Sequence, residues 1–380
     1  MSTITGSDEN NRRARAWVEV DRAAIASNVR ALAELARPAR VMAVVKADGY
    51  GHGAVEVART ALSAGAQVLA VATTPEGLAL RRAGLSAPIL VFGVEGAAEP
   101  VAELVSADLT ATVTTEGFAR RLALEAARQR RTVRVHLKVE TGMGRLGALP
   151  DEAVDLARLC ASAGPLTLEG IYSHLATADE EDPSYLRLQA RRFAAVLDAL
   201  ESAGLRPPVR HLVNTAGLLA APELRYDMVR LGLGLYGYYP APHLRGRATL
   251  RPALRLVAAV TEVRRMPAGS GISYGRTHVT TRATTIATLP VGYADGFTRR
   301  LSNRARALWN GCLYPVVGRI CMDQCMVDTG DDVPPVGAAM CLLGPGNQGE
   351  MTVDEAAQIS GSIPYEIVTQ LGPRLPRLYP

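Results

Sequence analysis

Eight short apolar segments alternate with helix patterns between residues 41 and about 240, and this alternation restricts the folds that the chain can adopt. Several of the helix patterns end in Ala-Gly, which stops a helix without a Cβ penalty. Eight strands with helices between them, over roughly 200 residues, are typical of a (β/α)8 TIM-type barrel. The segments are "VMAVV" (41–45), "VLAVA" (68–72), "PILVF" (88–92), "LTATV" (109–113), "VRVHLKV" (133–139), "LTLEGIY" (166–172), "VRHLV" (209–213) and "DMVRL" (227–231).

A doubly wound α/β sheet is the alternative fold. It needs fewer strands and usually a G-x-G-x-x-G turn after the first strand, a pattern that does not follow residue 45. After residue 245 the sequence changes to Val/Thr-rich runs broken by Gly and Pro, which indicates an all-β domain of short strands. We therefore expect a barrel over residues 14–245 and a C-terminal β domain over residues 246–380. The segment "AWVEV" (16–20) precedes the barrel and could pair with the C-terminal sheet.

Composition argues against several classes of protein. The formal net charge is only +5 and the arginines are scattered among acids, so we expect no nucleic-acid partner. The sequence has no apolar run of 18 residues and no apolar core in its first dozen residues, so we expect a cytoplasmic protein without membrane contact. Five dispersed cysteines do not suggest a disulfide framework, and the pair Cys321 and Cys325 reads as two ordinary thiols rather than a metal site.

Lys46 is one of only two lysines, and the other 40 of the 42 basic residues are arginines. It follows the first apolar segment directly. An ammonium at the edge of an apolar barrel is partly desolvated, which lowers its pKa and makes the neutral amine accessible. A neutral amine can form a Schiff base with an aldehyde, whereas a guanidinium cannot. Lys46 is therefore a candidate catalytic residue rather than one more surface cation.

Polar residues recur at or after the ends of the predicted strands, where barrels of this type place their chemistry. They are Lys46, Lys138, Arg145, His174, Asn214, Thr215 and Arg230. The glycines of "GYGHG" (49–53) permit close approach of the backbone to a ligand, and we expect a flexible loop there. The "LGLGLYG" stretch that contains Gly232 and Leu233 could donate backbone N–H groups to a phosphate.

The order of nine motifs resembles that of the bacterial alanine racemases, which are enzymes that use pyridoxal 5′-phosphate. The motifs are Lys46 in its context, "HLKVETGMGRLG", "SHLATAD", "VNTAG", "VRLGLGLYG", "SYG", "PVGYADG", "GRICMDQ" and "PYEIVTQLGPRLPRLY". The resemblance covers residue 14 or so to the end of the chain. It implies a barrel that holds the cofactor and a C-terminal β domain.

The resemblance also implies a role for each matching residue. Lys46 would carry the cofactor, and Arg230 would contact the pyridine nitrogen. Arg145 would contact the cofactor's phenolic oxygen and the substrate carboxylate, and His174 would lie against the ring. Tyr50, Thr215, Gly232 and Tyr365 would hold the phosphate, and Asn214 and Leu233 would also contact the cofactor.

Racemisation needs an acid–base group on each face of the substrate's Cα. By resemblance, Lys46 serves the D-enantiomer and Tyr274 the L-enantiomer, with Tyr274 lent by the other subunit of a homodimer. Met322 would bind the substrate carboxylate from the same partner, supported by Asp323. Tyr293 and Tyr365 would narrow the substrate's way in and favour a side chain of methyl size, hence alanine. Without the resemblance, Tyr274 would read as a half-buried strand tyrosine.

Lys138 is the second lysine. In many members of the family the matching residue is N-carboxylated, a reaction open to an amine and closed to a guanidinium. A salt bridge to Glu140 is the simpler alternative.

Other functions remain compatible with these residues. The same cofactor and fold could serve a broader amino-acid racemase that accepts serine, a decarboxylase or a D-threonine aldolase. A regulator that binds the cofactor without catalysis would leave the β domain unexplained. A Schiff-base aldolase without the cofactor would leave the phosphate-type loops and Arg230 unexplained. The resemblance favours interconversion of L- and D-alanine, which supplies D-alanine for peptidoglycan.

Overall fold

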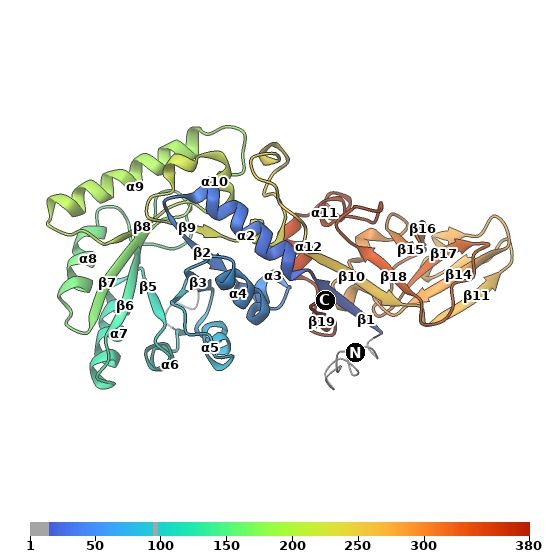
Figure 1. The fold of residues 1–380 in the computed structure, drawn as a ribbon, viewed down its shortest axis with the longest axis horizontal. Helices are drawn as coiled ribbons and strands as arrows, with labels where there is room; N and C mark the ends of the chain where they lie inside the picture. Colours follow the sequence, from blue (N-terminus) through green and yellow to red (C-terminus); the bar gives the residue numbers. More distant parts are fainter. Residues whose placement is uncertain (1–14, 94–97) are drawn as a thin grey trace. The chain divides into compact units, whose positions relative to one another are not determined.

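The computed structural model describes residues 15–93 and 98–380, which group into two compact units (Figure 1). The barrel unit contains residues 25–49 and 54–250. The C-terminal unit contains the described residues up to 24, the short segment 50–53 and residues 251–380. Residue 14, the predicted first residue of the barrel domain, and the first dozen residues lie outside the described residues.

Eight parallel strands form the barrel sheet, in the order β8-β7-β6-β5-β4-β3-β2-β9. Two hydrogen bonds join the outer strands and close the barrel, from Asp227 N–H to Arg210 O at 3.0 Å and from Arg230 N–H to Val213 O at 3.1 Å. All eight predicted segments are confirmed as strands. They are β2 (Arg40–Val44), β3 (Val68–Val71), β4 (Ile89–Val91), β5 (Thr110–Val113), β6 (Val133–Lys138), β7 (Leu166–Tyr172), β8 (Val209–His211) and β9 (Met228–Leu231).

Helices follow the strands along the chain and lie around the outside of the sheet (Figure 1). Strands β3, β4, β5 and β9 are buried at every position, as expected for parallel strands covered on both faces. The helices are α2 (Arg22–Ala36), α3 (Lys46–Tyr50), α4 (Ala54–Ser63), α5 (Thr74–Arg82), α6 (Val101–Ser106), α7 (Glu116–Arg128), α8 (Ala153–Ser162), α9 (Ser184–Ser202) and α10 (Thr215–Ala220), with 3₁₀ turns η2 (Pro222–Leu224), η3 (Leu233–Tyr236) and η4 (Pro242–Leu244).

The C-terminal unit is built on a nine-stranded sheet, in the order β11-β14-β17-β16-β15-β18-β10-β1-β19. Strand β1 pairs antiparallel with β10 and parallel with β19. The strands are β1 (Ala16–Val20), β10 (Leu254–Ala259), β11 (Glu262–Met266), β14 (Thr284–Leu289), β15 (Arg306–Trp309), β16 (Cys312–Val317), β17 (Cys325–Gly330), β18 (Ala339–Leu343) and β19 (Arg377–Leu378), with a separate ribbon of β12 (Gly271–Ile272) and β13 (His278–Val279).

Short helical elements complete the C-terminal unit. Helix α11 (Val353–Ser360) is capped at its start by Thr352, whose side chain accepts a hydrogen bond from Glu355 N–H at 3.1 Å. It is capped at its end by Gly361, which has a φ of 66°. This is the N-cap and glycine C-cap pattern of a short amphipathic helix. The remaining elements are α12 (Pro364–Thr369), η5 (Tyr274–Arg276), η6 (Tyr293–Asp295) and η7 (Arg299–Leu301).

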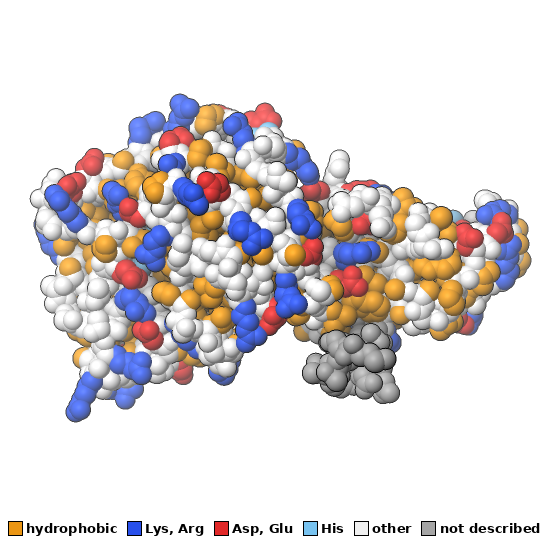
Figure 2. All heavy atoms as spheres, in the orientation of Figure 1, with side chains coloured by type: hydrophobic (Ala, Val, Ile, Leu, Met, Phe, Trp, Pro, Cys, Tyr) orange, Lys and Arg blue, Asp and Glu red, His pale blue; other side chains and the backbone are white. Residues whose placement is uncertain are grey.

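Charges of both signs are interspersed over the face drawn in Figure 2. Several oppositely charged residues pair with a neighbour along one helix, such as Arg120 with Glu116 and Arg158 with Asp155. Such exposed pairs contribute little to stability. In the described part of the chain, no helix has both the length and the apolarity that crossing a membrane requires.

Candidate active site

Lys46 lies just beyond β2, at the start of a left-handed turn. Ala47, Asp48 and Gly49 have φ values of 51°, 50° and 61°. A non-glycine residue costs about 1–2 kcal/mol in this conformation, so neighbouring groups must stabilise it. Asp48 Oδ1 accepts a hydrogen bond from Ala54 N–H at 2.9 Å. The residues directly after Lys46 therefore form a hydrogen-bonded turn.

Glu76, in the first turn of α5, fixes this turn. Its Oε1 accepts a hydrogen bond from Ala47 N–H at 2.6 Å, and its Oε2 accepts one from Ala72 N–H at 2.7 Å. Glu76 also forms the capping box of α5 with Thr73. One carboxylate thus joins the ends of β2 and β3 and orients the residue beside Lys46. The sequence reasoning missed Glu76, although Thr73 and Glu76 carry the spacing of a capping box.

Several cations surround His174 in the barrel unit. Burial is the main cause that lowers the pKa of His174 well below its usual value, followed by the charges of Arg230, Arg145, Lys138 and Lys46. Burial and Arg145 also lower the pKa of Lys46, with Glu76 opposing them. The structure therefore brings Lys46, Lys138, Arg145, His174 and Arg230 together, and it makes the Lys46 amine easier to deprotonate.

Lys138 ends β6 and is buried. Burial, then Arg145 and Arg230, lowers the pKa of Lys138 to about 8. The carboxylate of Glu140 accepts hydrogen bonds from the backbone N–H groups of Gly142, Met143 and Arg145 instead of forming the simple salt bridge weighed above. Glu140 therefore shapes the loop that carries Arg145, and its charge raises the pKa of Lys138 only as a minor cause.

Arg230 is buried on β9 and donates hydrogen bonds in several directions. Its Nη2 donates to Ser173 O and Leu212 O, each at 2.8 Å, and lies 3.3 Å from His174 Nδ1. Its Nη1 donates to His211 Nδ1 at 3.0 Å and to His211 O at 3.1 Å. Burial lowers the pKa of Arg230 to about 10, so the guanidinium is charged at neutral pH. His211 was not predicted, although it is a polar residue inside an apolar strand segment.

The loops after β8 and β9 lie side by side. Thr215 Oγ1 accepts a hydrogen bond from Gly232 N–H at 3.1 Å, and Asn214 caps α10 by accepting one from Gly217 N–H at 2.9 Å. A Cβ added at Gly234 would lie 2.6 Å from the Thr215 side chain, so only glycine allows this close approach. Leu233 is buried in η3. Thr215, Gly232 and Leu233 thus form one compact loop pair at the end of the barrel.

The donor set of the barrel unit fits pyridoxal 5′-phosphate. An amine with a lowered pKa suits an aldehyde, and the cations around His174 suit an anionic group. The loop pair at Thr215 and Gly232 is the arrangement that barrels of this type use after their last two strands to hold a phosphate. Lys46, Arg145, His174, Thr215 and Arg230 are the residues that could hold the cofactor.

Three other predicted residues meet in the C-terminal unit. Tyr274, Tyr293 and Met322 are exposed by 71%, 43% and 53%. Tyr293 N–H donates to Cys321 O at 3.0 Å, and Ser273 Oγ donates to Arg319 O at 2.6 Å, so the three loops are tied together. We call Tyr274, Tyr293 and Met322 the exposed loop cluster. Large apolar side chains grouped in this way are typical of an interaction site.

The remaining predicted residues also lie in the C-terminal unit. The rings of Tyr50 and Tyr365 lie 6.1 Å apart, and burial with Tyr365 nearby raises the pKa of Tyr50, so its hydroxyl stays protonated. Asp323 forms a 2.8 Å ion pair with Arg374. Gly51 has a φ of 77°, and a Cβ there would meet Val368 O at 2.1 Å, which explains the glycine of this segment.

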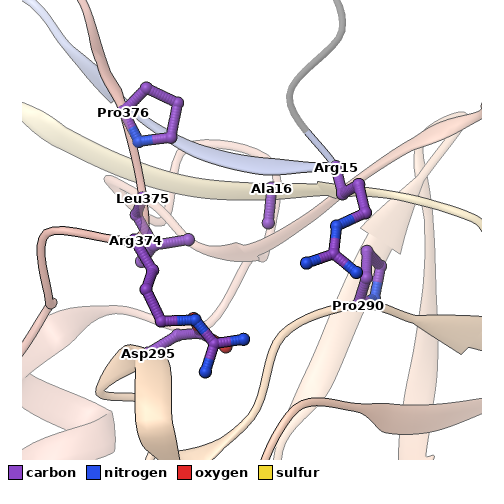
Figure 3. Close-up of a pocket in the computed structure, with 7 residues that line it drawn as sticks. All are labelled: Arg15, Ala16, Pro290, Asp295, Arg374, Leu375 and Pro376. Atoms are coloured by element: carbon purple, nitrogen blue, oxygen red, sulfur yellow. The ribbon is translucent and has the colours of Figure 1, made fainter.

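A cavity of about 230 Å³ also lies in the C-terminal unit (Figure 3). It is lined by Arg15, Ala16, Pro290, Asp295, Arg374, Leu375 and Pro376. Asp295 is ion-paired with Arg374 at 3.2 Å and accepts a hydrogen bond from Gly292 N–H at 3.0 Å. Asp295 and Arg374 thus hold the turn next to Tyr293. None of the predicted site residues lines the cavity.

Comparisons with known proteins agree with this description. The family description "Alanine racemase, N-terminal domain" matches residues 20–240, and "Alanine racemase, C-terminal domain" matches residues 253–379. The alanine racemase of Symbiobacterium thermophilum is 48% identical over 364 residues, covering 96% of each chain. That of Thermobifida fusca is 44% identical, covering 96% of this chain and 98% of its own.

Solved structures give the same result. The alanine racemase of Streptomyces lavendulae has a TM-score of 0.91 at 39% identity and covers 97% of both chains. That of Bacillus anthracis with bound L-Ala-P has a TM-score of 0.89 at 36% identity, covering 97% of this chain and 95% of its own. Since sequence and fold match over nearly the whole length of both units, the chain belongs to the alanine racemase family.

Proposed function

We propose that this protein interconverts L- and D-alanine with pyridoxal 5′-phosphate, and that the D-alanine serves peptidoglycan synthesis. The observation that carries the proposal is Lys46. It is an amine whose pKa is lowered by burial and by Arg145, at the strand-end edge of a barrel that gathers four cations around His174. An aldehyde with an anionic group is the class of cofactor that such a site attracts.

The bound cofactor would supply an electron-withdrawing ring that acidifies the proton on the substrate's Cα. The chain's residues would bind and orient it. Lys46 is the residue that would attach to it, and Thr215 and Gly232 would hold its phosphate together with Tyr50 and Tyr365. Arg230, fixed by Ser173 O and Leu212 O, would offer an N–H to the ring nitrogen. A guanidinium only donates, so it keeps that nitrogen unprotonated.

Two groups would move the substrate's proton. Lys46, with its lowered pKa, is the acid–base group for the D-enantiomer. Tyr274, from the exposed loop cluster of a second copy, is the group for the L-enantiomer. General acid–base catalysis of this kind contributes about 10²–10⁴-fold each.

The exposure of Tyr274 supports a homodimer with composite sites. A catalytic tyrosine that is 71% exposed, grouped with Tyr293 and Met322, would be shielded from water by a partner protomer. Met322 N–H and Arg145 would bind the substrate carboxylate from the two subunits. Asp323, paired with Arg374, would hold the Met322 loop. Tyr293 and Tyr365 would limit the substrate side chain to methyl size.

The experiment is reduction of the purified holoenzyme with borohydride, followed by peptide mapping and an enantiomer-resolved assay of alanine, serine and valine. We expect a yellow protein, a label on Lys46 and preference for alanine. A label on another residue would overturn the role of Lys46. Turnover of serine or valine as fast as alanine would favour the broader racemase.

A further inference from the structure

Arg230 is a buried cation whose direct partners are all uncharged. Its hydrogen bonds go to the carbonyl oxygens of Ser173, His211 and Leu212 and to the imidazoles of His174 and His211. Across residues 15–93 and 98–380, no salt bridge joins Arg230 to a carboxylate. A buried charge without a counter-charge is costly, so a more distant group is expected to compensate it.

A chain of three hydrogen bonds leads from Arg230 to a carboxylate. Arg230 Nη1 lies 3.0 Å from His211 Nδ1, and His211 Nε2 lies 2.8 Å from His136 Nδ1. His136 Nε2 lies 3.2 Å from Glu169 Oε2. Both imidazoles are buried, whereas the Glu169 side chain is 35% exposed. We call these four residues the histidine relay.

The two ends of the relay determine the direction of every hydrogen bond in it. A guanidinium can only donate, so His211 Nδ1 must accept, and a carboxylate can only accept, so His136 Nε2 must donate. The bond between the rings then runs from His211 Nε2–H to His136 Nδ1. Burial lowers the pKa of both histidines, which agrees with two neutral rings that each carry one proton.

The backbone is built to accommodate this arrangement. Val135 pairs with Leu168 and His136 pairs with Gly170, so Glu169 is the extra residue of a β-bulge in β7. Bulges re-aim side chains and recur next to active sites. A Cβ at Gly170 would lie 2.7 Å from the His136 ring, so glycine makes the space that the ring occupies.

Tyr172 fixes the other ring. It stacks on His211 with centroids 4.6 Å apart and planes 13° apart, and its hydroxyl lies 3.0 Å from Thr112 Oγ1. Each histidine of the relay is therefore held in position by strand residues and not only by its hydrogen bonds.

We propose that Glu169 and His136 are positioning residues for Arg230, acting through His211. The Glu169 carboxylate fixes the tautomers of both rings, and the resulting lone pair on His211 Nδ1 holds one guanidinium nitrogen. The other terminal nitrogen donates to Ser173 O and Leu212 O, so the guanidinium is held in one orientation. The effect on catalysis rests on the proposed function, in which Arg230 contacts the cofactor. The hydrogen bonds of the histidine relay do not depend on the proposed function.

The relay can be read without the cofactor, by nitrogen NMR of the apoprotein labelled with ¹⁵N in its six histidines. We expect His136 and His211 both to carry their proton on Nε2. The substitution Glu169→Gln removes the charge at similar size, and it should shift the ring nitrogens of both histidines while those of His243 and His278 stay in place. A proton on Nδ1 of His211, or an unchanged His211 in the variant, would overturn the proposal.

The holoenzyme provides the second measurement. In Glu169→Gln we expect kcat to fall roughly 10-fold, because Arg230 would be held less firmly, with KM for alanine changed less than about two-fold. Glu169→Asp, which restores the charge, should recover part of the loss. Glu201, which lies on α9 and forms an exposed ion pair with Arg206, provides the matched control, and Glu201→Gln should retain full activity. An unchanged kcat in Glu169→Gln would refute the catalytic part, whereas a wild-type protein without racemase activity would refute only the proposed function.

Discussion

Lys46 and Lys138, the two lysines of the chain, interact electrostatically, and the charge of Lys46 contributes to the lowered pKa of Lys138. Burial is the larger cause, followed by Arg145 and Arg230. Both residues are therefore amines that lose a proton more readily than a free lysine does. This gives a physical reason for a lysine at both positions in a chain that otherwise uses arginine, because a guanidinium stays protonated in the same surroundings.

Lys138 should make stability depend on pH. With a folded-state pKa of about 8 against 10.5 unfolded, the buried charge destabilises the protein at low pH. Between these values the folded state has released the proton and the unfolded state has not, so stability rises with pH. We compare wild type with Lys138→Gln. The difference between their free energies of unfolding should rise by about 3 kcal/mol between pH 8 and pH 10.5. Urea unfolding of the two apoproteins from pH 7 to pH 10.5 measures this difference, and a difference that does not change with pH would contradict the assignment.

The neutral amine of Lys138 should also react with carbon dioxide. The nitrogen forms a bond to carbon and releases one proton, which yields a carbamate whose negative charge would face Arg145. We expect a new ¹³C carbonyl resonance when the protein is incubated with labelled bicarbonate near pH 8. The resonance should be absent from Lys138→Arg, and its presence there would place the reaction elsewhere.

The substitution Lys46→Arg should show whether this position needs a primary amine or only a positive charge. The guanidinium keeps the positive charge but cannot attach to an aldehyde. We expect borohydride labelling at this position to disappear and turnover to fall on the order of 1,000-fold or more, because an acid–base group is lost as well. Lys138→Arg, which keeps Lys46, is the control and should keep the label. A labelled Lys46→Arg protein would mean that another amine serves the cofactor.

The left-handed turn after Lys46 should respond in opposite ways to two small substitutions. Ala47→Gly relieves the positive φ of 51° at an exposed position, and we expect a gain of about 0.5 kcal/mol after the entropy that glycine adds to the unfolded chain. Gly49→Ala places a Cβ 3.1 Å from the backbone of Ala54 at a φ of 61° and should cost about 1–3 kcal/mol. Thermal unfolding of both variants measures these changes in stability. A lower stability of Ala47→Gly than of wild type would show that the turn is not strained.

The sequence predicts correctly those features that depend on residues close together in the chain. The barrel strands read directly as apolar runs because parallel strands are covered on both faces. Lys46 could be singled out because a lysine is rare in this chain. The turn that presents it could not be predicted, since Ala47 and Asp48 adopt positive φ only because Glu76 and the Asp48 carboxylate hold the neighbouring N–H groups. The bulge at Glu169 could not be predicted from the sequence either, because it depends on the register between β6 and β7.

Tyr274→Phe tests the group proposed for the L-enantiomer. The side chain is exposed, so its hydroxyl can be removed without a cavity in the core, and we expect the fold and the binding of the cofactor to be unchanged. Net turnover in both directions must fall together, since the equilibrium between the enantiomers is fixed. The exchange of the Cα proton with solvent need not slow equally for the two enantiomers, because each enantiomer gives its proton to a different group.

The measurement is therefore the entry of solvent deuterium into recovered substrate, followed separately for L- and D-alanine. We expect exchange from L-alanine to slow by about 10²–10⁴-fold, while Lys46 continues to exchange the D-enantiomer. Val279→Ala, another exposed position in the C-terminal unit, is a control that should leave both rates unchanged. Exchange from L-alanine at the wild-type rate in Tyr274→Phe would show that another residue removes this proton, and the two-base proposal would then have to place that residue opposite Lys46.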